Sequence, residues 1–324
     1  MRALILTATL LGAGAPQAAS FDCTRAAMRM ERAICDNPQL SGLDEELDLA
    51  YRNAKNRLSP EAWKKFARGQ VSWLRFHSTH CFVDRQARAV AGTEAARCLI
   101  EAYRQRIRDI EDSGRELAGL KTFVVVDNQI NLSPRTPSVA SVERRYVQID
   151  GESRLASRLN EYLLPGLSPP GSGSEVSRIT LAVPTEDWFY RQEDNTSGGG
   201  SYSRSQRFCS VYSKSQDRLL FVRDFFGHED WKKIAERQAR QHFLTLSRRD
   251  PRFAPELLEQ LSLAPLDKGP NQVFLDCFDA DGIRLSGFLP QTAAAFDGVT
   301  VSWEALSEVL TPYARQHLEK LNRH

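Results

Sequence analysis

Residues 21–38 read FDCTRAAMRMERAICDNP, residues 70–81 read QVSWLRFHSTHC, and residues 97–112 read RCLIEAYRQRIRDIED. These stretches belong to one segment, Phe21 to Asp112, which contains four of the six cysteines: Cys23, Cys35, Cys81 and Cys98. No two of the four have the close spacing that thiolate metal ligands usually show. The segment therefore predicts a helical module that is held together by disulfides.

Apolar residues recur at helical spacing in four parts of this segment. We expect a first helix from Thr24 to Asp36, ended by Pro38, and a second helix with an apolar face from Leu43 to Ala54. Ser59 is expected to cap the third helix, with Pro60 at its first position, and Thr93 to cap the fourth. The prediction for this region is an all-α, disulfide-stapled bundle.

Two disulfide pairings of the four cysteines are compatible with this bundle. A regular helix over residues 24–34 would hold Cys23 and Cys35 roughly 18 Å apart, beyond the ~7 Å limit for a disulfide. This favours Cys35–Cys81 with Cys23–Cys98, since the end of helix three returns toward the end of helix one. The alternative, Cys23–Cys35 with Cys81–Cys98, requires an irregular first helix and stays open.

The order of short motifs in this segment is more specific than any one of them. It contains Asp22-Cys23, Ile34-Cys35-x-x-Pro38-x-Leu40, Leu43-Asp44, Gln70-x-x-Trp73-Leu74 and Cys98-Leu99. In this order they resemble the N-terminal domain of LprI-like lysozyme inhibitors over residues 21–112. One departure is Phe76-His77, where the pattern has an Arg-Asp pair. The resemblance implies a protein that binds lysozyme and inhibits it.

Residues 1–20 have the pattern of a secretory signal peptide. A basic Arg2 precedes an apolar run from Ala3 to Leu11, and Ala18-Ala19-Ser20 supplies small residues at the expected cleavage site. The apolar run is about half the ~20 residues that a membrane span needs. We therefore expect a periplasmic or secreted protein with no membrane span after the signal is removed.

The composition suits two folded domains, and the net charge argues against a partner that is attracted by long-range electrostatics. The chain has 324 residues, of which 41% are hydrophobic and 26% charged, and its formal net charge is only +2. Such a charge provides no long-range attraction for nucleic acid or an anionic membrane. We expect a helical domain over 21–115 and a second domain over 121–324.

The second domain has the composition of an α+β fold. Strand patterns such as 122–126, 145–149, 179–183 and 208–212 alternate with helix patterns, and we expect an antiparallel sheet with packed helices. A turn is expected at Asp127-Asn128, a hairpin around 279–282, and a final helix that Ser302 caps. The six cysteines permit a third disulfide here, Cys209–Cys277.

Residues 197–312 resemble the C-terminal domain of RsiV-type proteins. The resemblance rests on Gly198-Gly199-Gly200 before a strand pair, the segment from Leu219 to Phe226 that leads into a helix, and the late hairpin. RsiV-type proteins are sensors whose extracellular part binds lysozyme. The resemblance therefore implies the same partner class as the first domain.

No motif in the sequence predicts catalysis or a cofactor. His228-Glu229-Asp230-Trp231-Lys232 begins like a zinc protease helix, but Lys232 stands where the second histidine ligand belongs. His77, His80, Cys81 and Cys98 could bind zinc only if the cysteines were not oxidised. We therefore expect no catalytic residue, no metal and no cofactor.

Inhibition of lysozyme needs a rigid surface that enters the glycan cleft. Two loops are candidates for this insert: 82–93, with Arg85 and Arg88, and 195–204, with Tyr202 and Arg204. Arginine forms charge-assisted pairs with cleft carboxylates. The alternative functions are a cell-envelope structural or assembly module that binds another protein, and an unrecognised wall-modifying enzyme.

Overall fold

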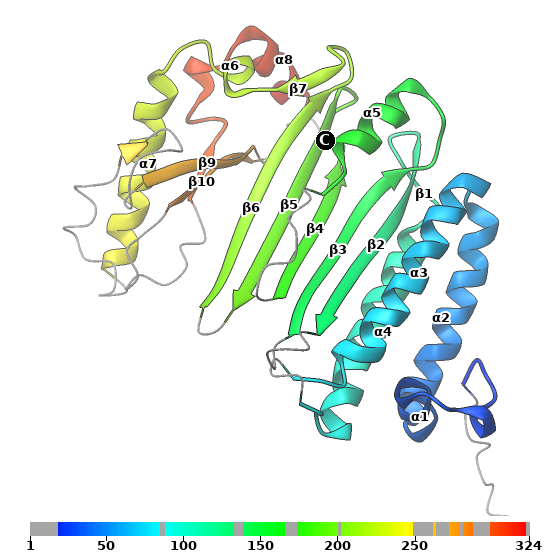
Figure 1. The fold of residues 1–324 in the computed structure, drawn as a ribbon. Coiled ribbons are helices and arrows are strands. Elements are labelled where there is room, and N and C mark those ends of the chain that lie inside the picture. Colours follow the sequence, from blue (N-terminus) through cyan, green and yellow to red (C-terminus); the bar gives the residue numbers. More distant parts are fainter. Residues whose placement is uncertain are drawn as a thin grey trace, which may run out of the picture.

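The computed structural model describes residues 19–84, 88–132, 139–165, 174–199, 202–248, 262–263, 272–278, 281–287 and 299–321. It shows a helical part followed by a mostly antiparallel sheet and a second, smaller sheet (Figure 1). This confirms the expected order of an all-α region and an α+β region. None of the described helices is both long enough and apolar enough to cross a membrane.

Four α-helices form the N-terminal part: α1 (Arg29–Asp36), α2 (Pro38–Arg57), α3 (Pro60–His80) and α4 (Gly92–Asp112). Asn37 caps α2 by accepting hydrogen bonds from the backbone N–H groups of Gln39 and Leu40. Ser59 caps α3 as expected, since its Oγ accepts from Ala62 N at 3.3 Å. The fourth helix begins at Gly92, one residue before the predicted cap at Thr93.

The expected helix over residues 24–36 is wrong in its first turns. A 3₁₀ turn, Cys23–Arg25, is followed by extended backbone at Ala26 and Met28, and α1 starts only at Arg29. The Glu31 carboxylate accepts from the N–H groups of Ala27 and Met28 at 2.8 and 2.9 Å, which satisfies the backbone without a helix. The chain therefore folds back on itself before α1.

This fold-back decides the disulfides. The Cα atoms of Cys23 and Cys35 lie 5.8 Å apart and the two residues are bonded, as are Cys81 and Cys98. The favoured pairing of Cys35 with Cys81 and Cys23 with Cys98 is therefore wrong, and the alternative is found. The reason is the irregular start of the first helix, which removes the separation that a regular helix would impose.

The main sheet has seven strands in the order β1-β2-β3-β4-β5-β6-β7. The strands are β1 (Arg115–Leu117), β2 (Leu120–Leu132), β3 (Val139–Ile149), β4 (Ser174–Ala182), β5 (Trp188–Gly199), β6 (Tyr202–Ser213) and β7 (Arg218–Leu220). Only β3 and β4 run parallel, and α5 (Arg154–Tyr162) lies in the connection between them. The turn expected at Asp127-Asn128 is absent because β2 pairs with β3 without a break from Thr122 to Leu132.

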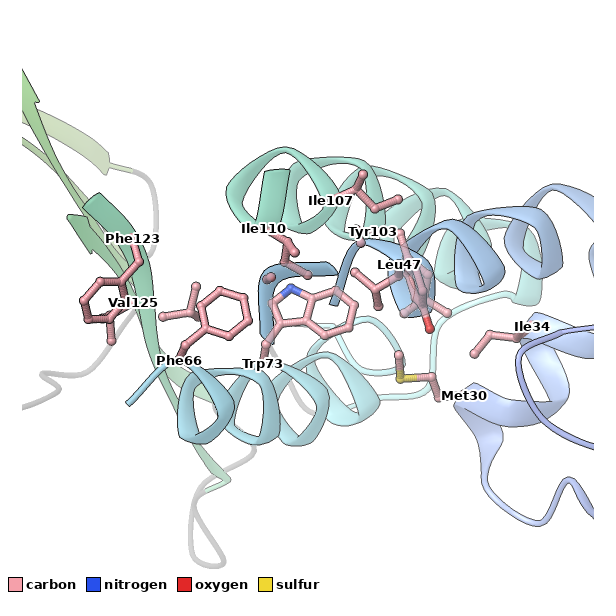
Figure 2. Packing of buried hydrophobic residues seen from close by; sticks show 14 of the residues in the cluster. Met30, Ile34, Leu47, Phe66, Trp73, Tyr103, Ile107, Ile110, Phe123 and Val125 are labelled. Carbon is pink, nitrogen blue, oxygen red and sulfur yellow. The ribbon is translucent and has the colours of Figure 1, made fainter. Parts of the chain in front are cut away.

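The helices and the sheet share one hydrophobic core. Phe66 and Trp73 of α3 pack with Tyr103 of α4 and with Phe123 and Val125 of β2, as Figure 2 shows. Helix α3 comes close to β2 at Gly69, where a Cβ atom would lie only 2.9 Å from the carbonyl oxygen of Val126. The boundary predicted near residue 115 therefore falls between two parts that bury each other's apolar side chains.

The C-terminal part adds a four-stranded sheet of order β11-β10-β9-β8. Its strands are β8 (Ser262–Leu263), β9 (Gln272–Phe278), β10 (Gly282–Gly287) and β11 (Val299–Ser302), and its helices are α6 (Val222–Phe225), α7 (Asp230–Ser247) and α8 (Pro312–Leu321). The expected hairpin between β9 and β10 is present. The predicted Cys209–Cys277 disulfide is also present and joins β6 to β9.

The last helix starts later than predicted. Ser302 Oγ accepts from Ala305 N at 3.2 Å, but the residues that follow form turns and a short 3₁₀ segment, Ser307–Val309. Leu306, Val309 and Leu310 are buried in this irregular stretch. Pro312 then begins α8, because proline suits the first position of a helix.

Candidate functional site

An open groove of about 930 Å³ lies between α1 and α4 at the end of the bundle that carries both N-terminal disulfides. We call it the arginine groove. Its lining includes the loop between α3 and α4, and its apolar residues are Ala33, Phe82, Ala89, Val90, Ala96 and Ile100. The groove thus offers apolar contact area within a polar rim, which is the usual anatomy of a protein-binding surface.

Four arginines line this groove. Arg29 and Arg32 come from α1, and Arg97 and Arg104 come from α4. All four side chains are exposed, and no ion pair is formed by any of them within the part of the chain that the structure describes. The lining contains only two acidic residues, Asp36 and Glu101. The groove therefore presents guanidinium groups that are available to an acidic partner.

The helical repeat explains how α4 serves both the groove and the core. Arg97, Glu101 and Arg104 follow one another at spacings of four and three, which places them on one face of the helix. The other face carries buried side chains that pack in the shared core: Leu99, Tyr103, Ile107 and Ile110. Packing of that face fixes the direction in which the arginines point.

Both disulfides stiffen the walls of the groove. Cys35 lies in α1 and is bonded to Cys23, while Cys98 lies beside Arg97 on α4 and is bonded to Cys81 at the end of α3. A surface that is ordered before binding loses less conformational entropy when a partner docks. The groove is thus suited to docking of a partner.

The sequence-predicted loop between α3 and α4 contributes to this groove, although its arginines do so less directly. Ala89 and Val90 line the groove, whereas Arg88 is held by Asp84 through two contacts of its guanidinium group, at 2.6 and 2.7 Å. Arg88 N also donates to Asp84 Oδ1 at 2.9 Å, which closes the loop on itself. Arg85 lies outside the described residues.

The second predicted loop is a strand hairpin instead. Strand β5 continues to Gly199 and β6 begins at Tyr202, with Gly199 paired to Tyr202, so residues 195–199 and 202–204 are ladder residues. Tyr202 and Arg204 lie on β6, which β3, β4 and β5 separate from the β2 strand on which α3 packs. The structure does not bring this hairpin to the arginine groove, and the side chains of Tyr202 and Arg204 are outside its described part.

The residues considered as zinc ligands have other partners. Cys81 and Cys98 are bonded to each other, so neither can supply a thiolate. His77 is 6% exposed and its ring lies 4.9 Å from that of Trp73 in a tilted arrangement, and burial together with the charge of His80 lowers the pKa of His77 to about 3. This histidine is a neutral core residue near neutral pH.

One polar cluster was not identifiable from the sequence. His317 Nε2 of α8 lies 3.3 Å from Asp187 Oδ2, which also accepts hydrogen bonds from Ser213 and Tyr313. Asp187 is partly desolvated, but the hydrogen bonds from Ser215, Ser213 and Tyr313 outweigh this and lower its pKa. Ser213 is fully buried, so the cluster anchors α8 to the sheet and offers no accessible nucleophile.

Comparison with known proteins gives matches of two kinds. No curated protein matches the sequence. A crystal structure of a DUF3298 family protein from Pseudomonas aeruginosa PAO1 superposes with a TM-score of 0.43 at 14% identity, covering 60% of this chain and 96% of that one. A DUF3298 family member from Bacteroides fragilis NCTC 9343 gives 0.45 at 11% identity, covering 64% and 100%.

The family comparison concerns the helical part. The family model described as lysozyme inhibitor LprI matches residues 23–110, which include all four cysteines of the bundle and every residue of the arginine groove. Residues 23–110 therefore match the lysozyme inhibitor LprI family model, and in this chain they are followed by a larger α+β region.

Proposed function

We propose that this protein binds lysozyme and inhibits it, and that the arginine groove enters or covers the glycan cleft. The observation that carries the proposal is the coincidence of the LprI match over 23–110 with a groove whose four arginines have no acidic partner in the described residues. LprI is a family of inhibitors and not of enzymes, so the proposed action is stoichiometric binding.

The chemistry of the groove fits the target. Lysozyme cleaves glycans with a pair of carboxyl groups that face one cleft. A guanidinium group forms two parallel, charge-assisted hydrogen bonds with a carboxylate, and such pairs are stronger than neutral ones. Arg97 and Arg104 stand on one helix face and could reach one cleft, while Ile100 between them supplies apolar contact.

The proposal includes a location outside the cytoplasm. Three disulfides and an LprI domain indicate an oxidising compartment outside the cytoplasm. Removal of residues 1–20 as a signal peptide and residence in the periplasm or the medium belong to the proposal. In that location the protein would meet lysozymes that attack the cell wall.

The test is lysis of a cell-wall suspension by lysozyme, followed as loss of turbidity, with the purified full-length protein added in increasing amounts. We expect inhibition that saturates near one equivalent. The double variant Arg97→Gln/Arg104→Gln should raise the inhibition constant about a hundredfold, because each of the two lost charge pairs removes on the order of 1.4 kcal/mol, a factor of about ten.

A matched control removes the same charge from another face. Lys64 and Arg68 are exposed on α3, line a different groove beside β2, and make no ion pair with a described residue. Lys64→Gln/Arg68→Gln should therefore inhibit like the parent chain. Equal loss in both double variants would point to net charge alone and would remove the arginine groove as the contact surface.

The alternatives give different results in the same assay. An envelope module with another protein partner would leave lysis unchanged at every concentration. A wall-modifying enzyme would release peptidoglycan fragments when no lysozyme is added. Either result would replace the inhibitor proposal.

A further inference from the structure

A second, smaller cavity lies where the helices meet the sheet. It has a volume of about 90 Å³ and is lined from one side by α3 and α4 and from the other by β2, β3 and β4. The strand register aligns Val126, Arg145 and Arg178 across the three strands, so Arg145 and Arg178 are direct neighbours on one face. Arg106 of α4 lines the cavity from the opposite side.

Arg106 is the unusual member of this set. Its side chain is among the largest fully buried ones, with 1% of the residue exposed. The Nε atom donates to Gln70 Oε1 at 2.8 Å, and the guanidinium carbon lies 5.0 Å from the centre of the Phe66 ring. The two terminal nitrogens, Nη1 and Nη2, are buried and have no hydrogen-bond partner among the described residues. A charged group in this state is costly unless something pairs with it.

The charges around the cavity do not balance. Three guanidinium groups, those of Arg106, Arg145 and Arg178, face two carboxyl groups, those of Asp109 and Glu143. Asp109 is already bound to Arg145 at 2.6 Å and to Gln105 at 2.8 Å.

The remaining titratable neighbours do not correct the imbalance. Burial raises the pKa of Glu143, although the charge of Arg178 opposes the shift, so Glu143 is the weaker of the two counter-ions. His77, which also lines the cavity, is neutral near pH 7 because its pKa is about 3. The site therefore carries a surplus of at least one positive charge beside an open volume.

We propose that this cavity binds one small monocarboxylate anion, of the size of acetate, on the terminal nitrogens of Arg106. The fork of Nη1 and Nη2 matches the two oxygens of a carboxylate, which accept both N–H groups and supply the missing negative charge. A single water molecule could accept from these donors but would leave the charge uncompensated. A cavity of about 90 Å³ has room for several water-sized groups, and so for the few heavy atoms of acetate.

The position of the cavity gives the ligand a structural effect. Because its walls belong both to the LprI domain and to the sheet, an anion bound there would hold α4 against β3 and β4. This effect does not depend on lysozyme binding, since none of the arginine-groove residues lines the cavity.

The test is the thermal unfolding temperature of the full-length protein in sodium acetate and in sodium gluconate, at equal pH and ionic strength. Gluconate carries the same carboxylate on a much larger molecule, so it controls for ionic strength and for surface binding. We expect the unfolding temperature to rise with acetate concentration and to level off as the site fills, as linkage requires for a ligand of the folded state. Gluconate should give no such rise.

Variants assign the effect to the cavity. Arg106→Met keeps an unbranched, apolar side chain and removes the charge, and it should abolish the difference between acetate and gluconate. Arg178→Gln changes an exposed residue at the cavity and should shift the acetate midpoint to higher concentration, which keeps the proposal testable if the Arg106 variant does not fold. The control Arg52→Gln, on the exposed face of α2, should respond like the parent chain.

Two results would overturn the proposal. Equal unfolding temperatures in acetate and gluconate for the parent chain would mean that the cavity holds only water. An acetate effect that persists in both Arg106→Met and Arg178→Gln would place the anion elsewhere. Neither result bears on lysozyme inhibition, which is measured separately by turbidity.

Discussion

The hydroxyl group of Tyr103 on α4 donates a hydrogen bond of 2.9 Å to Asp44 Oδ1 on α2. The other carboxylate oxygen of Asp44 accepts from Ser20 N at 2.9 Å and from Ser20 Oγ at 2.6 Å. Asp44 is only 7% exposed, so these donors replace the water that the carboxylate loses on folding. The contact between Tyr103 and Asp44 ties the fourth helix to the second, and it involves none of residues 1–20, whose removal is proposed above.

Tyr103→Phe tests the strength of this contact. The substitution leaves the ring in place but removes a hydrogen bond to a buried charge, which should lower the free energy of unfolding by about 1.5–3 kcal/mol. Urea unfolding under oxidising conditions measures the change. Tyr51→Phe is the matched control, since the Tyr51 hydroxyl makes no hydrogen bond within the described residues, and an equal loss in both variants would contradict the assignment.

The disulfides can be ranked by the loops that they close. Cys23–Cys35 and Cys81–Cys98 span 12 and 17 residues, and Cys209–Cys277 spans 68. The loop-entropy relation gives about 3 kcal/mol for each of the first two and about 4 kcal/mol for the third. Replacing both cysteines of Cys209–Cys277 by alanine should therefore lower the unfolding free energy most, and the same change at either of the other two disulfides should lower it less.

Peptide mapping without reduction checks the connectivity itself. Cross-linked fragments should join Cys23 with Cys35 and Cys81 with Cys98. A fragment that joins Cys35 with Cys81 would restore the pairing that a regular first helix favours and would contradict the fold-back before α1.

Gly69→Ala should destabilise the junction of α3 and β2. Helix propensity alone would favour alanine by about 1 kcal/mol. The added Cβ atom, however, would lie 2.9 Å from Val126 O and 3.2 Å from Val126 N, and backbone atoms cannot move aside cheaply. Overpacking of this kind costs roughly 1–3 kcal/mol, so we expect a net loss of unfolding free energy.

Gly92 provides the control for this substitution. It begins α4, and no atom lies within 4 Å of the position that a Cβ atom would take there, so Gly92→Ala should be neutral or slightly stabilising. If both variants raise the midpoint of urea unfolding, the close approach at Gly69 is not a constraint.

His77 makes stability depend on mildly acidic pH. Its pKa in the folded chain is about 3, against an ordinary value of 6.5, because burial and the nearby His80 disfavour the charged form. Between these values the unfolded chain binds a proton that the folded chain does not, so stability is lost as the pH falls below about 6.5. From about pH 7 to about pH 5 the loss due to this residue is roughly 2 kcal/mol.

The comparison of His77→Gln with the parent chain isolates this contribution. The variant should show a shallower decline of unfolding free energy over the same pH range. Parallel curves for His77→Gln and the parent would mean that His77 does not stay neutral in the fold.

Local signals in the sequence were sufficient for most of the helices. The cap at Ser59, the proline at position 60 and the apolar stripe that ends at Leu74 predict α3 because each depends on residues within one or two turns. The first helix was predicted too long because the Glu31 side chain competes for the backbone of Ala27 and Met28, and apolar spacing does not report such a bond.

The site could be predicted only in part. The loop at 82–93 was identified and does contribute to the arginine groove, but Arg29 and Arg97 come together only through the packing of two helices that are distant in sequence. In the sequence, arginines on the exposed face of a helix cannot be distinguished from ordinary solvated residues. The contact between Asp187 and His317 could not be predicted either. The two residues are far apart in the sequence, and only the tertiary structure brings them together.

The shared core of the helices and β2 means that the four helices are not a detachable unit. A fragment that ends near residue 115 would lack Phe123, Val125 and Val126, which pack among the buried residues of the helices. Such a fragment would leave Phe66 facing water and would be prone to aggregate. If such a fragment failed to inhibit lysozyme, the loss of the β2 side chains from its core would explain the failure. The result would therefore not show that the sheet contacts lysozyme.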